Sequence, residues 1–204
     1  MQLVTQRLAI LALTILWGAT AAAWAQEDNE TLRVFIFAGQ SNMVGSDSKV
    51  ADIQRFPPFA GLGEPQDDVL FSYCIGRQNK MRSDGWVALQ HVNNVVGPEL
   101  SFARKVTQHI KAPIAIIKCA AGGTHLGGDW NPDESIGFKM YPLTLDLIKM
   151  SLADLDKRGI KYRIEGFMWH QGENDMFEKD YMPNYGKNLK NFLAKWRRDL
   201  GTSK

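Results

Sequence analysis

The sequence predicts an α/β fold in which a parallel β-sheet lies between two layers of helices. Three apolar runs rich in β-branched residues have the length of buried parallel strands, at positions 32–38, 113–119 and 164–169. Apolar residues at helical spacing predict helices at positions 98–110, 142–157 and 185–200. Because strands and helices alternate along the chain, we expect a three-layer α/β/α arrangement with helices on both faces of the sheet.

The local sequence supports each of these elements. The first strand ends at Gly39, and Pro98 suits the first turn of a helix, where its missing N–H is not needed. The two later helices each have an apolar side, formed by Leu143, Leu147, Met150 and Leu155 in one and by Leu189, Phe192, Leu193 and Trp196 in the other. Residues 46–90 are punctuated by prolines and glycines and are predicted to form a long irregular loop with small inserted elements.

Residues 1–25 have the pattern of a secretory signal peptide. Arg7 precedes an apolar run at 8–19, and Ala23-Trp24-Ala25 fits a cleavage site, so we expect cleavage after Ala25. The apolar run is shorter than the ~20 residues that a membrane-spanning helix needs. The remaining residues, 26–204, have the length of one domain. The mature protein is therefore expected to be secreted or periplasmic, with no membrane attachment after cleavage.

The charge balance and the cysteine count exclude some classes of function. The chain has 24 basic and 22 acidic side chains, and this near-neutral balance gives no electrostatic basis for binding nucleic acid. No Cys/His cluster has the spacing of zinc ligands, so we expect no metal and no cofactor. Cys74 and Cys119 remain open to two interpretations, a disulfide in an oxidising compartment or buried free thiols.

Three polar segments follow the three predicted strands, at 39–43, 122–125 and 169–175. Ligands of open α/β sheets bind beyond the carboxyl ends of the strands, so these segments are expected to meet at one site. Aromatic residues in nearby loops are candidates for stacking on a ligand ring or, equally, for loop packing: Trp86, Trp130, Phe138 and Tyr141.

Ser41 is the candidate nucleophile of the first segment, Gly39-Gln40-Ser41-Asn42-Met43. A serine where a strand turns into a helix points its hydroxyl into the crevice, and the helix N-terminus offers N–H donors to a developing oxyanion. The alternative is that Ser41 only caps the helix. The chain has no G-x-S-x-G motif, which disfavours a standard α/β-hydrolase, and no Walker A or G-x-G-x-x-G motif, which disfavours a nucleotide-binding module.

The other two segments supply candidate hydrogen-bond donors. Gly122 and Gly123 let the backbone approach a ligand closely and leave N–H groups to donate, although a tight turn would use the same residues. In the third segment, the amides of Gln171 and Asn174 donate and the carboxylate of Glu173 accepts. A purely structural polar network is the alternative for this segment.

Four motifs together resemble the sialate O-acetylesterase domain family, which is similar to acetyl xylan esterases within the SGNH-hydrolase superfamily. They are Gly-Gln-Ser-Asn-Met at 39–43, Gly-Pro-Glu-Leu-Ser-Phe-Ala at 97–103, Ala-Gly-Gly-Thr at 121–124 and Trp-His-Gln-Gly-Glu-Asn-Asp at 169–175. The resemblance implies a flavodoxin-like sheet and a serine esterase that removes O-acetyl groups from carbohydrates, of the sialate or the plant or algal polysaccharide type. The implied partner is an acetylated carbohydrate.

The resemblance also implies roles for single residues. Ser41 matches the nucleophile, and its N–H contributes to the oxyanion hole. Gly123, with Gly122 as the second choice, matches the glycine that gives a further N–H, and Gln171 or Asn174 gives a side-chain amide. Residues that order the loops or contact substrate are Gln40, Glu173 and His125.

The chain departs from the family pattern in one respect. Family members carry a C-terminal Asp-x-x-His that supplies the general base, and no Asp-x-x-His occurs in this sequence. None of its histidines, His91, His109, His125 and His170, matches that base. The resemblance therefore implies that part of the domain is missing at the C-terminus, and that the 204-residue chain is poorly stable and nearly inactive. A non-catalytic carbohydrate-binding remnant of the fold is the alternative function.

Overall fold

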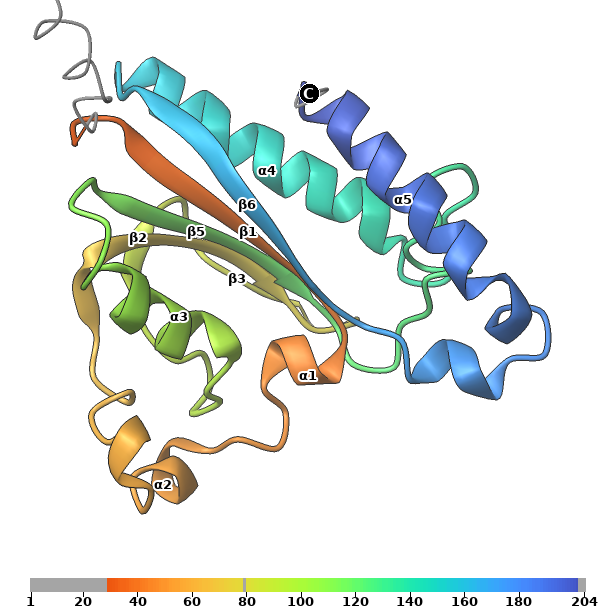
Figure 1. Ribbon diagram of the computed structural model, residues 1–204, viewed down its shortest axis with the longest axis horizontal. Coiled ribbons are helices and arrows are strands. Elements are labelled where there is room, and N and C mark those ends of the chain that lie inside the picture. The colour runs from red at the N-terminus through yellow and green to blue at the C-terminus, as the bar shows by residue number, and fades with distance from the viewer. Residues whose placement is uncertain (1–28, 79, 202–204) are drawn as a thin grey trace, which may run out of the picture.

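The computed structural model describes residues 29–78 and 80–201 and contains a mixed, mostly parallel sheet (Figure 1). Its strands follow the order β3-β2-β5-β1-β6, with β4 also paired to β2. Strands β1, β2, β5 and β6 run parallel to one another, whereas β3 and β4 run antiparallel to β2. The bounds are Leu32–Gly39 (β1), Gln66–Ile75 (β2), Met81–Arg82 (β3), Val87–Leu89 (β4), Ile114–Ala120 (β5) and Tyr162–His170 (β6).

Helices cover both faces of this sheet (Figure 1). On one face lie α1 (Ser41–Val44), α2 (Val50–Ile53) and α3 (Pro98–Val106), and on the other lie α4 (Met140–Lys157) and α5 (Tyr185–Asp199). Short 3-10 turns occur at Pro57–Phe59, Asn174–Phe177 and Met182–Asn184. Every residue of β1 and β5 is buried, because these central strands are covered on both sides. The predicted three-layer α/β/α arrangement is confirmed.

The region 46–90 differs from the prediction of an irregular loop. It contains β2, a ten-residue strand that runs parallel to β5 in an unbroken register from Val69 to Ile75, together with β3 and β4. The strand begins with the polar residues Gln66, Asp67 and Asp68, Pro65 stands directly before it, and Gly76 directly follows it. Because of these features, the local sequence does not indicate a strand here. The second half of β2 is buried and is stabilised as a strand by its pairing with β5.

The helices match the predicted segments with small differences. Helix α3 ends at Val106, earlier than expected, and α4 begins two residues earlier, at Met140. Met150 of α4 and Leu193 of α5 are exposed, contrary to the expected apolar sides. Strand β6 pairs with β1 alone among the described residues, and its side chains are half-buried or exposed throughout.

Cys74 and Cys119 are register partners on β2 and β5, and both are buried free thiols. Their mutual hydrogen bond lowers the pKa of Cys74 to about 7 and, with burial, raises that of Cys119. The expected signal peptide lies outside the described residues. In the part of the chain that is described, no helix is long and apolar enough to cross a membrane.

Candidate active site

Ser41 lies where β1 passes into α1, at the carboxyl edge of the sheet (Figure 1). The turn is held against β6, because the Gln40 N–H donates to the carbonyl oxygen of His170 at 3.0 Å. A Cβ on Gly39 would lie 2.1 Å from that same oxygen, so only glycine allows this approach of the two strands. Ser41 is the first residue of α1 and is half-buried.

Replacing Gly39 by alanine is expected to lower the free energy of unfolding by about 1–3 kcal/mol, because the added methyl group must push β1 and β6 apart. Urea unfolding followed by circular dichroism measures the effect. Gly186→Ala is the matched control, since its Cβ would meet nothing within 4 Å and it lies in α5. The control is expected to leave stability unchanged or to raise it by up to about 1 kcal/mol. Equal free energies of unfolding for the two variants would contradict the close approach of Gly39 to the carbonyl oxygen of His170.

The glycine segment after β5 borders the serine. A Cβ on Gly122 would lie 3.5 Å from Cβ of Ser41, whereas one on Gly123 would lie 2.0 Å from a guanidinium nitrogen of Arg77. Gly123 has φ of +71°, which favours glycine. Within the described residues, the N–H groups of Gly122 and Gly123 donate to no protein acceptor. The structure thus places Gly122, the second choice from sequence, against Ser41, and Gly123 beside Arg77.

Glu173 connects the turn that carries Ser41 to the third polar segment, residues 169–175. The side-chain amides of Gln40 and Asn42 both donate to its carboxylate. Asn174 donates from Nδ2 to Oε1 of Gln40 at 2.6 Å. Residues more than 130 positions apart in the sequence are therefore brought into one hydrogen-bond network around Ser41.

The amides of Gln171 and Asn174 are both engaged within the protein. Each donates to the carbonyl oxygen of Thr124, at 3.0 and 3.3 Å. The second hydrogen of Gln171 goes to buried Asp175, and that of Asn174 goes to Gln40. Donation by either amide to a substrate oxyanion would require one of these bonds to open.

Asp175 fixes the loop that follows the glycine pair. Its carboxylate accepts the backbone N–H groups of Leu126 and Gly127, at 2.8 and 2.9 Å. The residue before them, His125, is held by buried Asp129, which accepts its N–H at 2.9 Å and lies 3.4 Å from its Nδ1. Sequence reasoning did not identify Asp129, because nothing in its local sequence marks it as a hydrogen-bond partner of the loop.

None of the histidines is hydrogen bonded to Ser41 within the described residues. His125 is held by Asp129 and packs against the ring of Tyr181, with 5.6 Å between ring centroids. His91 accepts the N–H of Asn94, and His170 is exposed at the end of β6. No cluster of His, Cys, Asp or Glu suited to a metal ion occurs in the described part of the chain.

Two of the loop aromatics considered as stacking groups serve another purpose. Trp130 and Tyr141 are buried, and both rings contact Phe192 of α5. Trp130 also donates from its indole nitrogen to the hydroxyl of Thr124 at 2.9 Å. Trp130 thus packs its loop against α5, and Tyr141 packs the start of α4 against α5. Arg77 supports the loop from the other side: it donates to the carbonyl oxygen of Gly122, and no sequence motif marks it.

A buried ion pair lies beneath α1. Lys118 of β5 contacts Glu99 of α3, with 2.6 Å between Nζ and Oε2, and the side chains are only 1% and 2% exposed. Lys118 also donates to the carbonyl oxygen of Val44, the last residue of α1, at 3.3 Å. Burial lowers the pKa of Lys118, and the adjacent Glu99 opposes that shift. The pair therefore joins the sheet, the start of α3 and the end of the helix that carries Ser41.

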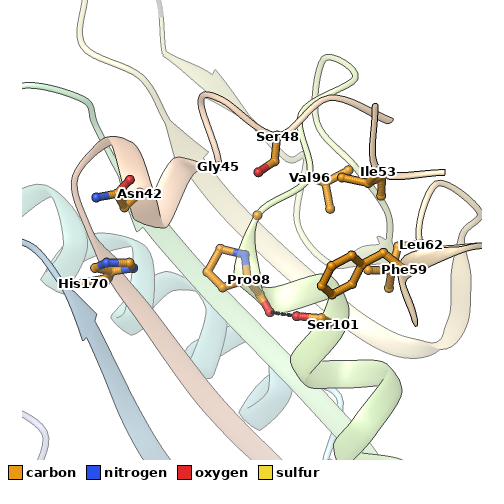
Figure 2. Close-up of a pocket in the computed structure, with 11 residues that line it drawn as sticks. Asn42, Gly45, Ser48, Ile53, Phe59, Leu62, Val96, Pro98, Ser101 and His170 are labelled. Carbon is orange, nitrogen blue, oxygen red and sulfur yellow. Dashed lines mark hydrogen bonds between the residues drawn. The ribbon is translucent and has the colours of Figure 1, made fainter. Parts of the chain in front are cut away.

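A pocket of about 240 Å³ lies beside α1 (Figure 2). It extends from Asn42, the residue after Ser41, across the start of α3 to the segment at 53–62. His170 borders the same end as Asn42. The turn that carries Ser41 therefore lies between the unengaged N–H groups of Gly122 and Gly123 and a pocket that begins at the neighbouring residue Asn42. N–H donors beside a serine hydroxyl are the groups that acyl transfer to serine uses.

Comparison with known proteins places the sequence in a family and the fold among solved structures. Residues 31–204 match the sequence family described as "Carbohydrate esterase, sialic acid-specific acetylesterase". A solved structure of a protein from Arabidopsis thaliana is similar, with a TM-score of 0.60 and 24% identity, over 83% of this chain and 69% of that one. A second is a carbohydrate acetylesterase from Xanthomonas citri, with a TM-score of 0.51 and 17% identity, over 82% of this chain and 39% of that one.

The chain thus spans about two fifths of the length of the Xanthomonas citri protein. No curated protein matches the sequence significantly. At these identities the two solved structures support the fold, whereas the family match extends over nearly the whole described chain. The chain belongs to the family of carbohydrate esterases described as sialic acid-specific acetylesterases.

Proposed function

We propose that this protein is a serine esterase that removes O-acetyl groups from carbohydrates, with Ser41 as the nucleophile. The observation that carries the proposal is the position of Ser41 at the start of α1, against Gly122 and its free N–H. Family membership supports a carbohydrate ester as the substrate. The signal-peptide pattern at 1–25 supports action outside the cytoplasm.

The proposed reaction proceeds by two acyl transfers. The Ser41 hydroxyl oxygen attacks the acetyl carbonyl carbon, and the hydroxyl proton passes to a base. The N–H groups of Ser41 and of the Gly122–Gly123 pair stabilise the tetrahedral oxyanion. The ester C–O bond then breaks, the sugar oxygen takes up the proton, and the acetyl group remains on Ser41. Water attacks this second ester and releases acetate.

Removal of the proton from the Ser41 hydroxyl is the step that limits the rate in this proposal. No histidine is hydrogen bonded to Ser41 within the described residues, so none of their imidazoles is placed to accept the proton. General base catalysis contributes about 10²–10⁴-fold, so acetate release without an added base is expected to be slower than base-assisted release by that factor.

Acetate release from acetylated xylan, measured by NMR with and without added imidazole, tests the proposal. Imidazole supplies a base that can accept the proton of the half-buried Ser41 hydroxyl, so release is expected to rise at least about tenfold over the imidazole-only control. Release that is no faster with the protein than without it, at any imidazole concentration, would contradict the esterase function.

A carbohydrate-binding protein without catalysis is the second candidate. It is favoured by the engaged amides of Gln171 and Asn174 and by the lack of a histidine on Ser41 in the described part. Glycan binding without acetate release, and unaffected by imidazole, would support this candidate instead.

A further inference from the structure

Gly122 and Gly123 are the central residues of the turn between Ala121 and Thr124, directly after β5. The outer residues of this turn are held by hydrogen bonds. The N–H of Ala121 donates to the carbonyl oxygen of Gly39 at 3.1 Å, and the hydroxyl of Thr124 donates to the carbonyl oxygen of Ala121 at 2.8 Å. With both ends of the turn held, the orientation of the peptide unit between the two glycines remains to be set.

A peptide unit at the centre of a four-residue turn has two opposite orientations. Rotating it exchanges a type II turn, in which φ of the third residue is positive, for a type I turn, in which that φ is about −90°. Gly123 is the third residue here and has φ of +71°. Glycine adopts positive and negative φ about equally well, so the local sequence does not select between the two orientations.

Arg77, two residues after the end of β2, contacts this peptide unit from one side. Its Nε–H donates to the carbonyl oxygen of Gly122, and a Cβ on Gly123 would lie 2.0 Å from its Nη2. The peptide bond is trans, so its C=O and its N–H point in opposite directions. The hydrogen bond to Arg77 therefore directs the N–H of Gly123 away from the guanidinium group.

The guanidinium group of Arg77 is itself held by the loop that precedes α4. Its Cζ lies 5.5 Å from the centre of the Phe138 ring, a cation–π contact. The backbone N–H of Phe138 donates to buried Asp129 at 2.8 Å, and the same carboxylate accepts the N–H of His125. Asp129 thus fixes both the ring beside Arg77 and the chain that follows the glycine turn.

We propose that Arg77 is a positioning residue of the esterase, which holds the Gly122–Gly123 peptide unit with its N–H available to the oxyanion that forms at Ser41. Gly122 borders the serine, because its Cβ would lie 3.5 Å from Cβ of Ser41. The opposite orientation would place a carbonyl oxygen where the N–H of Gly123 now lies, and a carbonyl oxygen repels an oxyanion that an N–H stabilises. The inference rests on the proposed function and adds to it a residue outside the sequence motifs.

The kinetic test follows the first turnover with p-nitrophenyl acetate, in which p-nitrophenolate is released as Ser41 is acetylated. Arg77→Met removes the donor and keeps an unbranched side chain beside Phe138. The acylation rate constant at saturating ester is expected to fall by about tenfold to a hundredfold, because an oxyanion donor is lost. The ester concentration that gives the half-maximal rate is expected to change by less than about twofold, since the donor acts on the oxyanion and not on the bound ester.

The burst amplitude separates positioning from a merely structural role. The amplitude counts the folded, reactive molecules, whereas the rate constant describes each of them. We expect the amplitude of Arg77→Met to stay within about 20% of wild type. A loss of amplitude with an unchanged rate constant would mean that Arg77 only stabilises the fold, and it would overturn the proposal.

Two further variants control for charge and for the donor. Arg82 is an exposed arginine of β3 that forms no hydrogen bond to the glycine turn within the described residues, so Arg82→Met is expected to leave the rate constant within about twofold of wild type. Arg77→Lys keeps a cationic donor and is expected to react at least about threefold faster than Arg77→Met. Equal losses in Arg77→Met and Arg82→Met, or no gain in Arg77→Lys, would overturn the assignment.

NMR shows the orientation of the peptide unit without any reaction. A strong NOE between the N–H of Gly123 and an α-hydrogen of Gly122 is typical of a type II turn, and it weakens when the peptide unit rotates to type I. We expect the strong NOE in the wild-type protein and in Arg82→Met, and a weakened one in Arg77→Met. The same NOE intensities in wild type and Arg77→Met would show that Arg77 does not set the orientation, and would overturn the proposal.

The role of Arg77 and the esterase function fail separately. If no acetyl group forms on Ser41 in the wild-type protein while the NOE weakens in Arg77→Met, the proposed function fails and the orientation of the peptide unit by Arg77 stands. If Ser41 is acetylated at the same rate in wild type and Arg77→Met, the role of Arg77 fails and the esterase stands.

Discussion

Replacing Lys118 by methionine is expected to lower the free energy of unfolding by about 3–5 kcal/mol. The substitution leaves the carboxylate of Glu99 buried without its cation, and removing one partner of a buried ion pair has an effect of this size. It also removes the donor to the carbonyl oxygen of Val44 at the end of α1. Chemical denaturation at neutral pH measures the loss.

The double variant Lys118→Met, Glu99→Leu is the control for this prediction. Both charges are then gone and apolar side chains fill the same space, so most of the lost stability is expected to return. A single variant that loses less than about 1 kcal/mol would contradict the view that these two charges depend on each other. A double variant as unstable as the single one would show that shape, rather than charge, explains the loss.

Replacing Ser41 by alanine is expected to eliminate the imidazole-dependent release of acetate, a decrease of at least about tenfold, because no acyl acceptor remains. The free energy of unfolding is expected to stay within about 0.5 kcal/mol of wild type, since the hydroxyl is half-buried and makes no side-chain hydrogen bond within the described residues. NMR detection of acetate and a denaturation curve give the two readouts.

Ser46→Ala is the matched control for Ser41→Ala. Ser46 is also half-buried and lies just beyond the end of α1, where its N–H donates to the carbonyl oxygen of Ser41. The substitution keeps that backbone bond and leaves the candidate nucleophile in place, so acetate release is expected to be unchanged. Loss of release in both variants would indicate a disturbed turn instead of a missing nucleophile.

The strands and helices with strong local patterns could be predicted from the sequence, and the ones that depend on partners could not. The uninterrupted apolar runs of β1 and β5 identify strands buried on both faces, and the three long helices follow from their apolar spacing. Strand β2 begins with Gln66-Asp67-Asp68 among glycines and prolines, so its identity as a strand comes from pairing with β5. Tertiary context overrides local propensity there.

The meeting of the polar segments at one edge follows from topology. Parallel strands place their carboxyl ends together, which is why Gln40 and Glu173 become hydrogen-bond partners across the sheet. The individual side-chain hydrogen bonds and ion pairs do not follow from the strand topology. Three contacts depend on side-chain positions that no local sequence pattern encodes. They are the hydrogen bond of Gln171 to Asp175, the hydrogen bond of Arg77 to Gly122 and the ion pair of Lys118 with Glu99.

The most direct test of the account is the identity of the residue that carries the acetyl group. Because no base contacts Ser41 in the described residues, hydrolysis of its acetyl ester is expected to be slow, and the acyl-enzyme should accumulate when the chain is treated with p-nitrophenyl acetate. Mass spectrometry of the acid-quenched, digested protein is predicted to find the acetyl group on the peptide containing Ser41, and to find none there in Ser41→Ala. Acetylation confined to lysines or to the N-terminus, with Ser41 unmodified, would contradict the assignment of the nucleophile.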